Sequence, residues 1–147
     1  MRFAQRHAIT DLCLLVESAE RSIAFYAGKL GFKLRRRAEG FADFCGAGLT
    51  LAVWEIDHMS RATGVPNRRA GPGARKVVAA VEVSPPAAID EVYAELTKAG
   101  VAIEAPPADY PWNARCLYFA DPDDNLWEVY AWLPGGPEAS HVVSPPA

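Results

Sequence analysis

The sequence predicts an α+β fold made of two βαβββ modules, which form a curved mixed sheet around a shared cavity. The order strand, helix, strand, strand, strand occurs twice along the 147 residues. Residues repeat as well, because Leu30-Gly31-Phe32-Lys33-Leu34 corresponds to Ala99-Gly100-Val101-Ala102-Ile103 at an offset of 69. Each module alone leaves one sheet face bare. Packing two modules edge to edge therefore closes one sheet, with the cavity on its inner face and the helices outside.

Module one spans residues 8–55. Residues 9–16 are apolar apart from one charge and predict a buried strand. Residues 19–30 carry Ile23, Tyr26 and Leu30 on one helical stripe, and the following Gly31 is typical of a helix C-terminus. Three further strands are expected at residues 32–37, 41–45 and 49–55, with the Gly46-Ala47-Gly48 turn between the last two.

Module two spans residues 77–133 and follows a linker at 56–76. The linker contains Gly64, Pro66, Gly71, Pro72 and Gly73 and predicts a loop. The expected elements of module two are a buried strand at 77–83, a helix at 87–99, a short strand at 101–104 and a hairpin of 115–120 with 126–132. The tail, residues 134–147, has no periodic pattern, and we expect it to be loosely held.

The composition argues against several functional classes. The net charge is −3, and the basic runs at residues 35–37 and 68–69 are typical of a solvated edge rather than of a nucleic-acid surface. No apolar run is long enough to span a membrane. The cysteines Cys13, Cys45 and Cys116 lack metal-binding spacing. Their odd number and the absence of a signal peptide predict reduced thiols in a cytoplasmic protein.

Three stretches resemble the vicinal-oxygen-chelate superfamily of glyoxalases, bleomycin-resistance proteins and dioxygenases. They are Ser22-Ile23-Ala24-Phe25-Tyr26 with Leu30-Gly31-Phe32, then residues 110–115, and finally the Phe119-Ala120-Asp121-Pro122-Asp123-Asp124-Asn125 stretch that continues to Glu128. The resemblance covers roughly residues 8–133. Asp124 stands where the family usually has Gly, and Asp tolerates the left-handed turn better than most residues. Because this fold hosts many functions, the resemblance implies the fold more strongly than the reaction.

Enzymes of this family typically hold one divalent metal on four strands. The resemblance places those positions on Asp11, Thr50, a residue at or within two positions of Val78, and Glu128. This set offers two carboxylates, one hydroxyl and one hydrocarbon. The histidines His7, His58 and His141 lie elsewhere. A hard cation such as Mg²⁺ or Mn²⁺ accepts such oxygen ligands, whereas Ni²⁺ or Zn²⁺ would lack an imidazole. We therefore expect no metal and no cofactor, with Asp11 and Glu128 as the ligands if a metal does bind.

The alternative use of the two acids is polar anchoring in an aromatic, largely apolar pocket. Strand alternation and the loop before the last hairpin predict the ligand-binding residues. They are Asp11, Cys13, Thr50, Trp54, Tyr110, Trp112, Arg115, Glu128 and Tyr130. Two structural readings stay open: Glu128 pairs with Arg115 in a salt bridge, or Asp11 is itself paired or bonded in a turn. Trp127 has the opposite parity, and we expect it to pack against a helix.

The favoured function is a metal-independent protein of the bleomycin-resistance type that sequesters an aromatic or polycyclic natural product or drug. One alternative is a glyoxalase-like divalent-metal lyase, isomerase or epimerase. Another is a metal-free enzyme in which Glu128 or Asp11 is the general base, because burial raises a carboxyl pKa. The expected partners are a small organic ligand and, as is common in the family, a second copy in a homodimer. The 56–76 segment is a candidate for the dimer contact.

Overall fold

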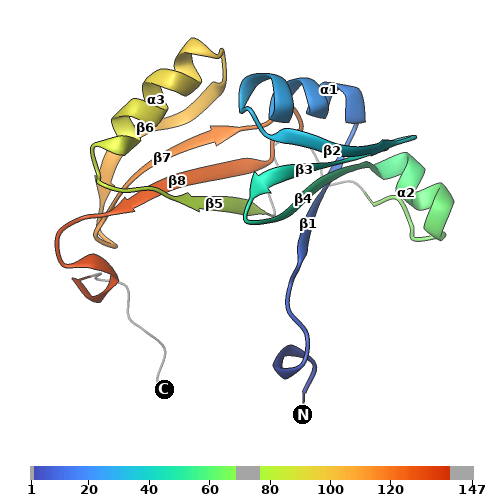
Figure 1. The fold of residues 1–147 in the computed structure, drawn as a ribbon, viewed down its shortest axis with the longest axis horizontal. Coiled ribbons are helices and arrows are strands. Elements are labelled where there is room, and N and C mark those ends of the chain that lie inside the picture. The colour runs from blue at the N-terminus through green and yellow to red at the C-terminus, as the bar shows by residue number, and fades with distance from the viewer. Residues whose placement is uncertain (1, 69–76, 140–147) are drawn as a thin grey trace. The chain divides into compact units, whose positions relative to one another are not determined.

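Two four-stranded mixed sheets, each with a helix over one face, make up the computed structural model (Figure 1). The structure describes residues 2–68 and 77–139 and divides into two units, residues 1–71 and 72–147. In each unit the first strand pairs in parallel with the last, and the other neighbours are antiparallel. The α+β class and the doubled βαβββ order are confirmed.

The first unit has the sheet order β1-β4-β3-β2. Its elements are η1 (Phe3–Gln5), β1 (Asp11–Val16), α1 (Ala19–Ile23), η2 (Ala24–Lys29), β2 (Lys33–Ala38), β3 (Phe41–Ala47), β4 (Leu49–Glu55) and α2 (Ile56–Thr63). Ser18 caps the N-terminus of α1, and its hydroxyl accepts a hydrogen bond from the Arg21 amide. It continues as the wider turns of η2, where the Leu30 amide donates to the carbonyl of Phe25.

The second unit has the order β5-β8-β7-β6. Its elements are β5 (Val78–Glu82), α3 (Ala88–Lys98), β6 (Ala102–Tyr110), β7 (Ala114–Ala120), β8 (Leu126–Trp132) and η3 (Gly136–Ala139). Gly31 and Gly100 follow the helices of their units with φ of 78° and 72°, a conformation that favours glycine. These equivalent glycines explain why the repeat is visible in the sequence.

Each unit buries its own apolar layer between helix and sheet. In the first unit Tyr26, Phe44 and Leu51 are almost fully buried, and in the second Ile89 and Leu117 are. The other sheet face of each unit therefore carries the side chains of opposite parity, among which lie most of the candidate site residues.

The turn between β7 and β8 is held by Asp121, which is buried. Its carboxylate accepts hydrogen bonds from the amides of Asp123, at 2.9 Å, and Asn125, at 2.8 Å. Asp124 has φ of 64°, so Asp does occupy the left-handed position at this point of the motif. The acidic run of this motif therefore has a structural explanation.

Three expectations about secondary structure were wrong. The 56–76 segment is not all loop, because residues 56–63 form α2, which ends at Gly64 with φ of 74°. Strand β5 is not buried, since it is an edge strand and Val78 is 52% exposed. Strand β6 continues through Pro106 and Pro107, which an edge strand with register shifts tolerates. The rest of the linker, 69–76, and the tail beyond 139 lie outside the described residues.

Candidate functional sites

The open face of the first unit begins with Asp11 and Cys13 on β1. Both are exposed and Leu14 is buried, so β1 alternates between its two faces and is half-buried, which corrects the expectation of a buried strand at residues 9–16. Asp11 lies opposite Thr50 on β4. Its carboxylate accepts a hydrogen bond from the hydroxyl of Thr10, which is the local bonding that the sequence left open. Asp11 and Thr50 thus form one polar row across the sheet.

The equivalent row of the second unit consists of Ala80 and Glu128, which lie opposite each other. Val78 instead lies opposite Leu126. The first-strand position expected at or near Val78 is therefore Ala80, two residues further along. The same residue follows from Asp11 by the repeat offset. A methyl group stands beside Glu128 where the first unit has a carboxylate beside Thr50.

These four positions do not fit a divalent metal. Ala80 has no donor atom, Thr50 offers a neutral hydroxyl, and each unit supplies one carboxylate. Across residues 2–68 and 77–139, no group of three or more His, Cys, Asp and Glu side chains is placed to hold a metal ion. The donor chemistry therefore favours a role for Asp11 and Glu128 other than metal ligation.

Glu128 belongs to an aromatic cluster formed by Tyr110, Trp112 and Tyr118. The Tyr118 hydroxyl donates a hydrogen bond to the Glu128 carboxylate. The Tyr110 ring meets Tyr118 edge to face at 5.9 Å and stacks on Trp112 at 4.5 Å. All four residues are partly exposed. We call this group the Glu128 cluster; it combines a carboxylate, a hydroxyl and stacked rings on one half-open surface.

Burial and charge act together on the neighbours of Glu128. Desolvation raises the pKa of Tyr118, and the bond to Glu128 raises it further, so the phenol remains a donor at neutral pH. Burial also raises the pKa of the Cys116 thiol. Tyr130 reaches Glu82 through its hydroxyl at 3.4 Å, and its pKa is likewise raised, mainly by desolvation.

Arg115 does not pair with Glu128, which corrects one structural reading of the sequence. Its guanidinium binds Asp90 of α3 at 2.7 Å and Asp109 of β6 at 3.0 Å. Alternation along β7 places it with Leu117 on the helix side, whereas Tyr118 lies opposite Glu128 on the other face. The structure therefore separates Arg115 from the Glu128 cluster.

Trp54 lies on the open face of the first unit, opposite Leu15 of β1. Its indole N–H donates to Nδ1 of His58 at 3.0 Å, and its ring meets Phe41 edge to face. Helix α2 brings His58 to this position. The sequence placed His58 in a loop and so missed this imidazole. Trp127, by contrast, is buried and stacked on Phe119, on the helix side as expected.

Asp43 is the most deeply buried carboxylate of the first unit, with a side chain 1% exposed. It accepts hydrogen bonds from Arg35 Nε and Nη2 at 3.0 and 2.9 Å, and from Arg36 N and Nε at 3.1 and 2.8 Å. The Arg35 guanidinium, joined by that of Arg36, holds the pKa of Asp43 well below its usual range despite burial. The basic run is thus partly neutralised rather than simply solvated.

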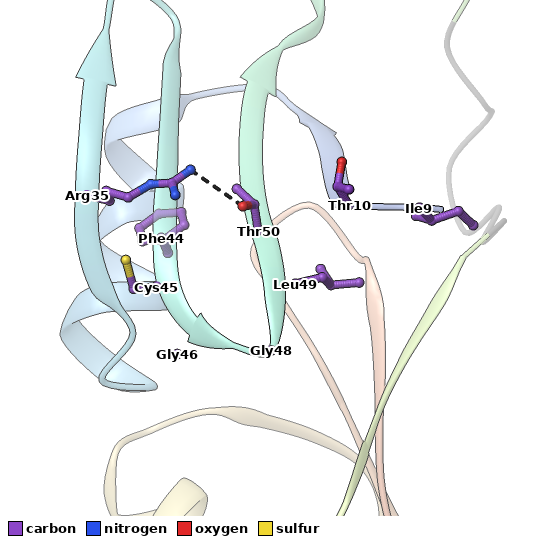
Figure 2. A pocket seen from close by; sticks show the side chains of 9 residues that line it. All are labelled: Ile9, Thr10, Arg35, Phe44, Cys45, Gly46, Gly48, Leu49 and Thr50. Carbon is purple, nitrogen blue, oxygen red and sulfur yellow. Dashed lines mark hydrogen bonds between the residues drawn. The ribbon is translucent and has the colours of Figure 1, made fainter. Parts of the chain in front are cut away.

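A cavity of about 470 Å³ opens beside this network (Figure 2). Its lining comes from the segment before β1, from strands β2, β3 and β4, and from Gly48 between the last two. The lining residues are Ile9, Thr10, Arg35, Phe44, Cys45, Gly46, Gly48, Leu49 and Thr50. Arg35 Nη2 lies 3.5 Å from the Thr50 hydroxyl, so the cavity contains one of the residues that the sequence assigned to ligand binding.

Sequence reasoning missed Arg35, Asp43 and Tyr118. A signal existed for Asp43, a single acid inside the apolar strand Phe41–Ala47, because buried acids are rare unless paired. A signal for Tyr118 lay in strand alternation, which puts it on the same face as Glu128 once the hairpin register is known. Arg35 depends on a register shift between Leu34 and Arg36 that the residues alone do not reveal.

Comparison with known proteins identifies a family model and a related bacterial protein. The family model described as Glyoxalase/Bleomycin resistance protein/Dioxygenase superfamily matches residues 7–129. The uncharacterized protein YraH of Bacillus subtilis (strain 168) is 28% identical over 129 residues, covering 85% of this chain and 98% of its own.

No helix among the described residues has both the length and the apolar composition needed to cross a bilayer.

Solved structures show the same fold. A glyoxalase/bleomycin resistance protein/dioxygenase from Nocardioides is 46% identical, with a TM-score of 0.85, covering 95% of this chain and 91% of that one. A lactoylglutathione lyase from Agrobacterium tumefaciens is 22% identical, with a TM-score of 0.68, covering 84% of this chain and 92% of that one. At that identity the second likeness concerns the fold alone.

Proposed function

The chain belongs to the Glyoxalase/Bleomycin resistance protein/Dioxygenase superfamily, and on that premise we propose that it is a metal-independent small-molecule binding protein of the bleomycin-resistance type. It sequesters an aromatic or polycyclic natural product or drug. The observation that carries this proposal is the Glu128 cluster, where stacked Tyr110 and Trp112 lie next to the hydrogen-bonded pair of Tyr118 and Glu128.

Such a cluster suits a flat ligand for two physical reasons. Exposed ring faces stack on a ligand ring, and each aromatic pair contributes about 0.5–1.5 kcal/mol beyond the area that it buries. The Glu128 carboxylate accepts hydrogen bonds from ligand hydroxyl or amine groups, which fixes the orientation of the ligand. Sequestration needs no further chemistry. The donor set at Asp11, Thr50, Ala80 and Glu128 supports binding rather than metal catalysis.

The test is a binding screen on protein treated with a chelator. A panel of aromatic and polycyclic antibiotics is titrated while tryptophan fluorescence is followed, and equilibrium dialysis checks each hit. We expect at least one compound with micromolar affinity, unchanged when Mn²⁺, Ni²⁺ or Zn²⁺ is added. Trp112→Ala should weaken this binding by about tenfold, because it removes a stacking surface.

The matched control is Trp127→Phe, which replaces a tryptophan on the helix side of the same sheet. It should change the affinity by less than about twofold, because Trp127 is buried on the face of β8 opposite the Glu128 cluster. Phe keeps an apolar ring at that position, and residues without shared partners act nearly independently. A broad panel without any micromolar binder, or binding that requires an added metal, would contradict the proposal.

A metal-free enzyme is the second candidate, because Glu128 is held by Tyr118 in a defined orientation. In this reading Glu128 is the general base, and Tyr118 positions it. Asp11 is the less favoured base, since it is exposed. A glyoxalase-like lyase, isomerase or epimerase is the corresponding reaction class. Glu128→Gln separates the two candidates: a binding protein keeps its function with modestly changed affinity, whereas an enzyme binds its substrate but loses turnover.

The proposal also includes a cytoplasmic homodimer. All three cysteines are free thiols, which supports a reducing compartment. Val78 and Val81 on the edge strand β5 are 52% and 39% exposed, and exposed valines on an unpaired edge support self-association.

A further inference from the structure

The cavity beside β2 contains a guanidinium with unused hydrogen-bonding capacity. An arginine has five N–H donors, of which Asp43 and Thr50 engage Nε and Nη2 of Arg35. Among the residues that the structure describes, Nη1 has no protein acceptor. The Arg35 side chain is 41% exposed, so Nη1 is accessible from the cavity. Figure 2 shows Arg35 next to Thr50 in the lining.

The charge of this guanidinium is not cancelled by its partner. Asp43 already has a second cation, because Arg36 Nη2 lies 2.6 Å from the same carboxylate oxygen that Arg35 binds at 2.9 Å. Two guanidiniums therefore face one carboxylate. The bonds to Asp43 also fix the plane of the Arg35 head group, so little side-chain entropy is lost when a further acceptor binds.

One acid partly offsets this positive charge. Asp11 lies opposite Thr50 in the sheet, and its charge is among the effects, led by the hydrogen bond to Asp43, that raise the pKa of Arg35. A site with one accessible guanidinium and a nearby carboxylate suits a singly charged anion better than a phosphate, which carries about −1.5 to −2 charges at neutral pH.

The lining of the cavity combines polar groups with two exposed aliphatic side chains. Ile9 is 85% exposed and Leu49 is 40% exposed, and both belong to the lining. Large exposed aliphatic side chains beside a few polar groups are typical of a small-molecule site, and the volume of about 470 Å³ lies within the usual range of such pockets. The ligand is thus expected to join an anionic head to an apolar body.

We propose that the cavity lined by Arg35, Thr50, Ile9 and Leu49 binds the carboxylate of a small organic acid with an apolar body. Arg35 Nη1 and the Thr50 hydroxyl donate to the carboxylate, and Ile9 and Leu49 cover the hydrocarbon part. The inference goes beyond the proposed function, because this cavity lies in the first unit and the Glu128 cluster lies in the second. Charge-assisted bonds of this kind are about twice as strong as neutral ones, so they select the acid over its neutral analogues.

The experiment compares 2-naphthoate with the neutral 2-naphthamide by isothermal titration calorimetry on the full chain. We expect the acid to bind about tenfold more tightly than the amide. Arg35→Gln should abolish this preference. Arg37→Gln is the matched control, because it removes the same charge two residues along the chain. Arg37 pairs with Glu20 and lies outside the cavity lining. It should preserve the preference within about twofold.

Two further variants keep the test decisive if Arg35→Gln fails to fold. Thr50→Val removes the hydroxyl donor with little change of shape and should reduce the preference for the acid by several fold. Asp11→Asn removes the offsetting charge and should strengthen naphthoate binding by a few fold, with no effect on naphthamide. Naphthoate should also slow the alkylation of Cys45, which lines the cavity.

Equal affinity for acid and amide, or equal losses in the Arg35 and Arg37 variants, overturns the inference. Competition by millimolar inorganic phosphate as strong as that by acetate also overturns it, since it indicates a general anion site. If naphthamide and neutral aromatic drugs bind as tightly as naphthoate, the inference fails but the proposed function stands. Failure of every aromatic compound to bind defeats both.

Discussion

Asp43→Asn tests whether the buried carboxylate between two arginines stabilises the first unit. The substitution keeps the volume of the side chain but removes its charge and replaces one acceptor oxygen by an NH₂ group. Asp43 is 1% exposed on its side chain and accepts four hydrogen bonds. The amide retains the acceptor for two of them and points two N–H donors at donors of Arg35 and Arg36.

The expected loss follows from the bonds that disappear. Two hydrogen bonds to a charged group contribute about 1.5–3 kcal/mol each. Both guanidiniums are partly exposed, at 41% and 69%, so water recovers part of this loss. We therefore expect the free energy of unfolding to fall by about 3 kcal/mol, near the lower end of the range for breaking a buried pair. In a chain of this size that lowers Tm by about 10 °C.

The assay is urea unfolding followed by tryptophan fluorescence and circular dichroism, with the m-value checked for two-state behaviour. Glu20→Gln is the control, because it breaks the surface pair of Glu20 with Arg37 and should cost less than about 0.5 kcal/mol. A loss below about 1 kcal/mol for Asp43→Asn, or one equal to that of the control, would refute the reasoning.

The pH dependence gives an independent check of sign. The pKa of Asp43 is depressed in the folded chain, while the unfolded value is about 3.9. Below about pH 4 the unfolded state therefore binds a proton that the folded state does not, and the stability supplied by Asp43 declines. The stability difference between the original chain and Asp43→Asn should narrow as the pH falls from 5 to 3. A difference that widens would contradict the assignment.

Three further predictions concern other parts of the chain. Arg115→Gln should lower the free energy of unfolding by at most about 1 kcal/mol, because Asp90 and Asp109 are exposed partners, and it should leave ligand affinity unchanged in the fluorescence titration. Cys13 should react slowly with iodoacetamide at pH 8 although it is exposed, because desolvation and the Asp11 carboxylate raise the pKa of its thiol to about 11; fast alkylation would contradict this. Val81→Asp should shift the molar mass measured by light scattering toward that of a monomer, and an unchanged dimer would exclude β5 from the contact.

The fold was predictable because its signals are local and occur twice. Gly31 and Gly100 end equivalent helices, and Asp124 adopts the left-handed conformation that its turn requires. Each of these signals concerns a few consecutive residues. The doubled order of elements then leaves few ways to arrange the strands within a unit.

The candidate site was less predictable because it depends on which strand lies beside which. Strand alternation assigns Arg115 to a face of the sheet once the pairing of β7 is known. With the observed pairing, Arg115 lies on the helix side and binds Asp90. Asp43 meets Arg35 only through a register shift in β2. Helix α2 was missed because its segment is rich in Gly and Pro after Gly64, although residues 56–63 contain neither.

The parallel pairing of the first strand with the last has a consequence for how each unit is made. Asp11 lies opposite Thr50, 39 positions later, so β1 has no hydrogen-bonding partner until β4 has left the ribosome. The antiparallel β2–β3–β4 meander closes over short loops, so we expect it to form before β1 docks on its edge. Chains grow at about 5–20 residues per second, so the first unit has several seconds to complete its sheet before the last strand of the second emerges. Until β1 docks, the nascent chain exposes the hydrogen-bonding edge of β4, and we expect aggregation through that edge to be confined to this interval.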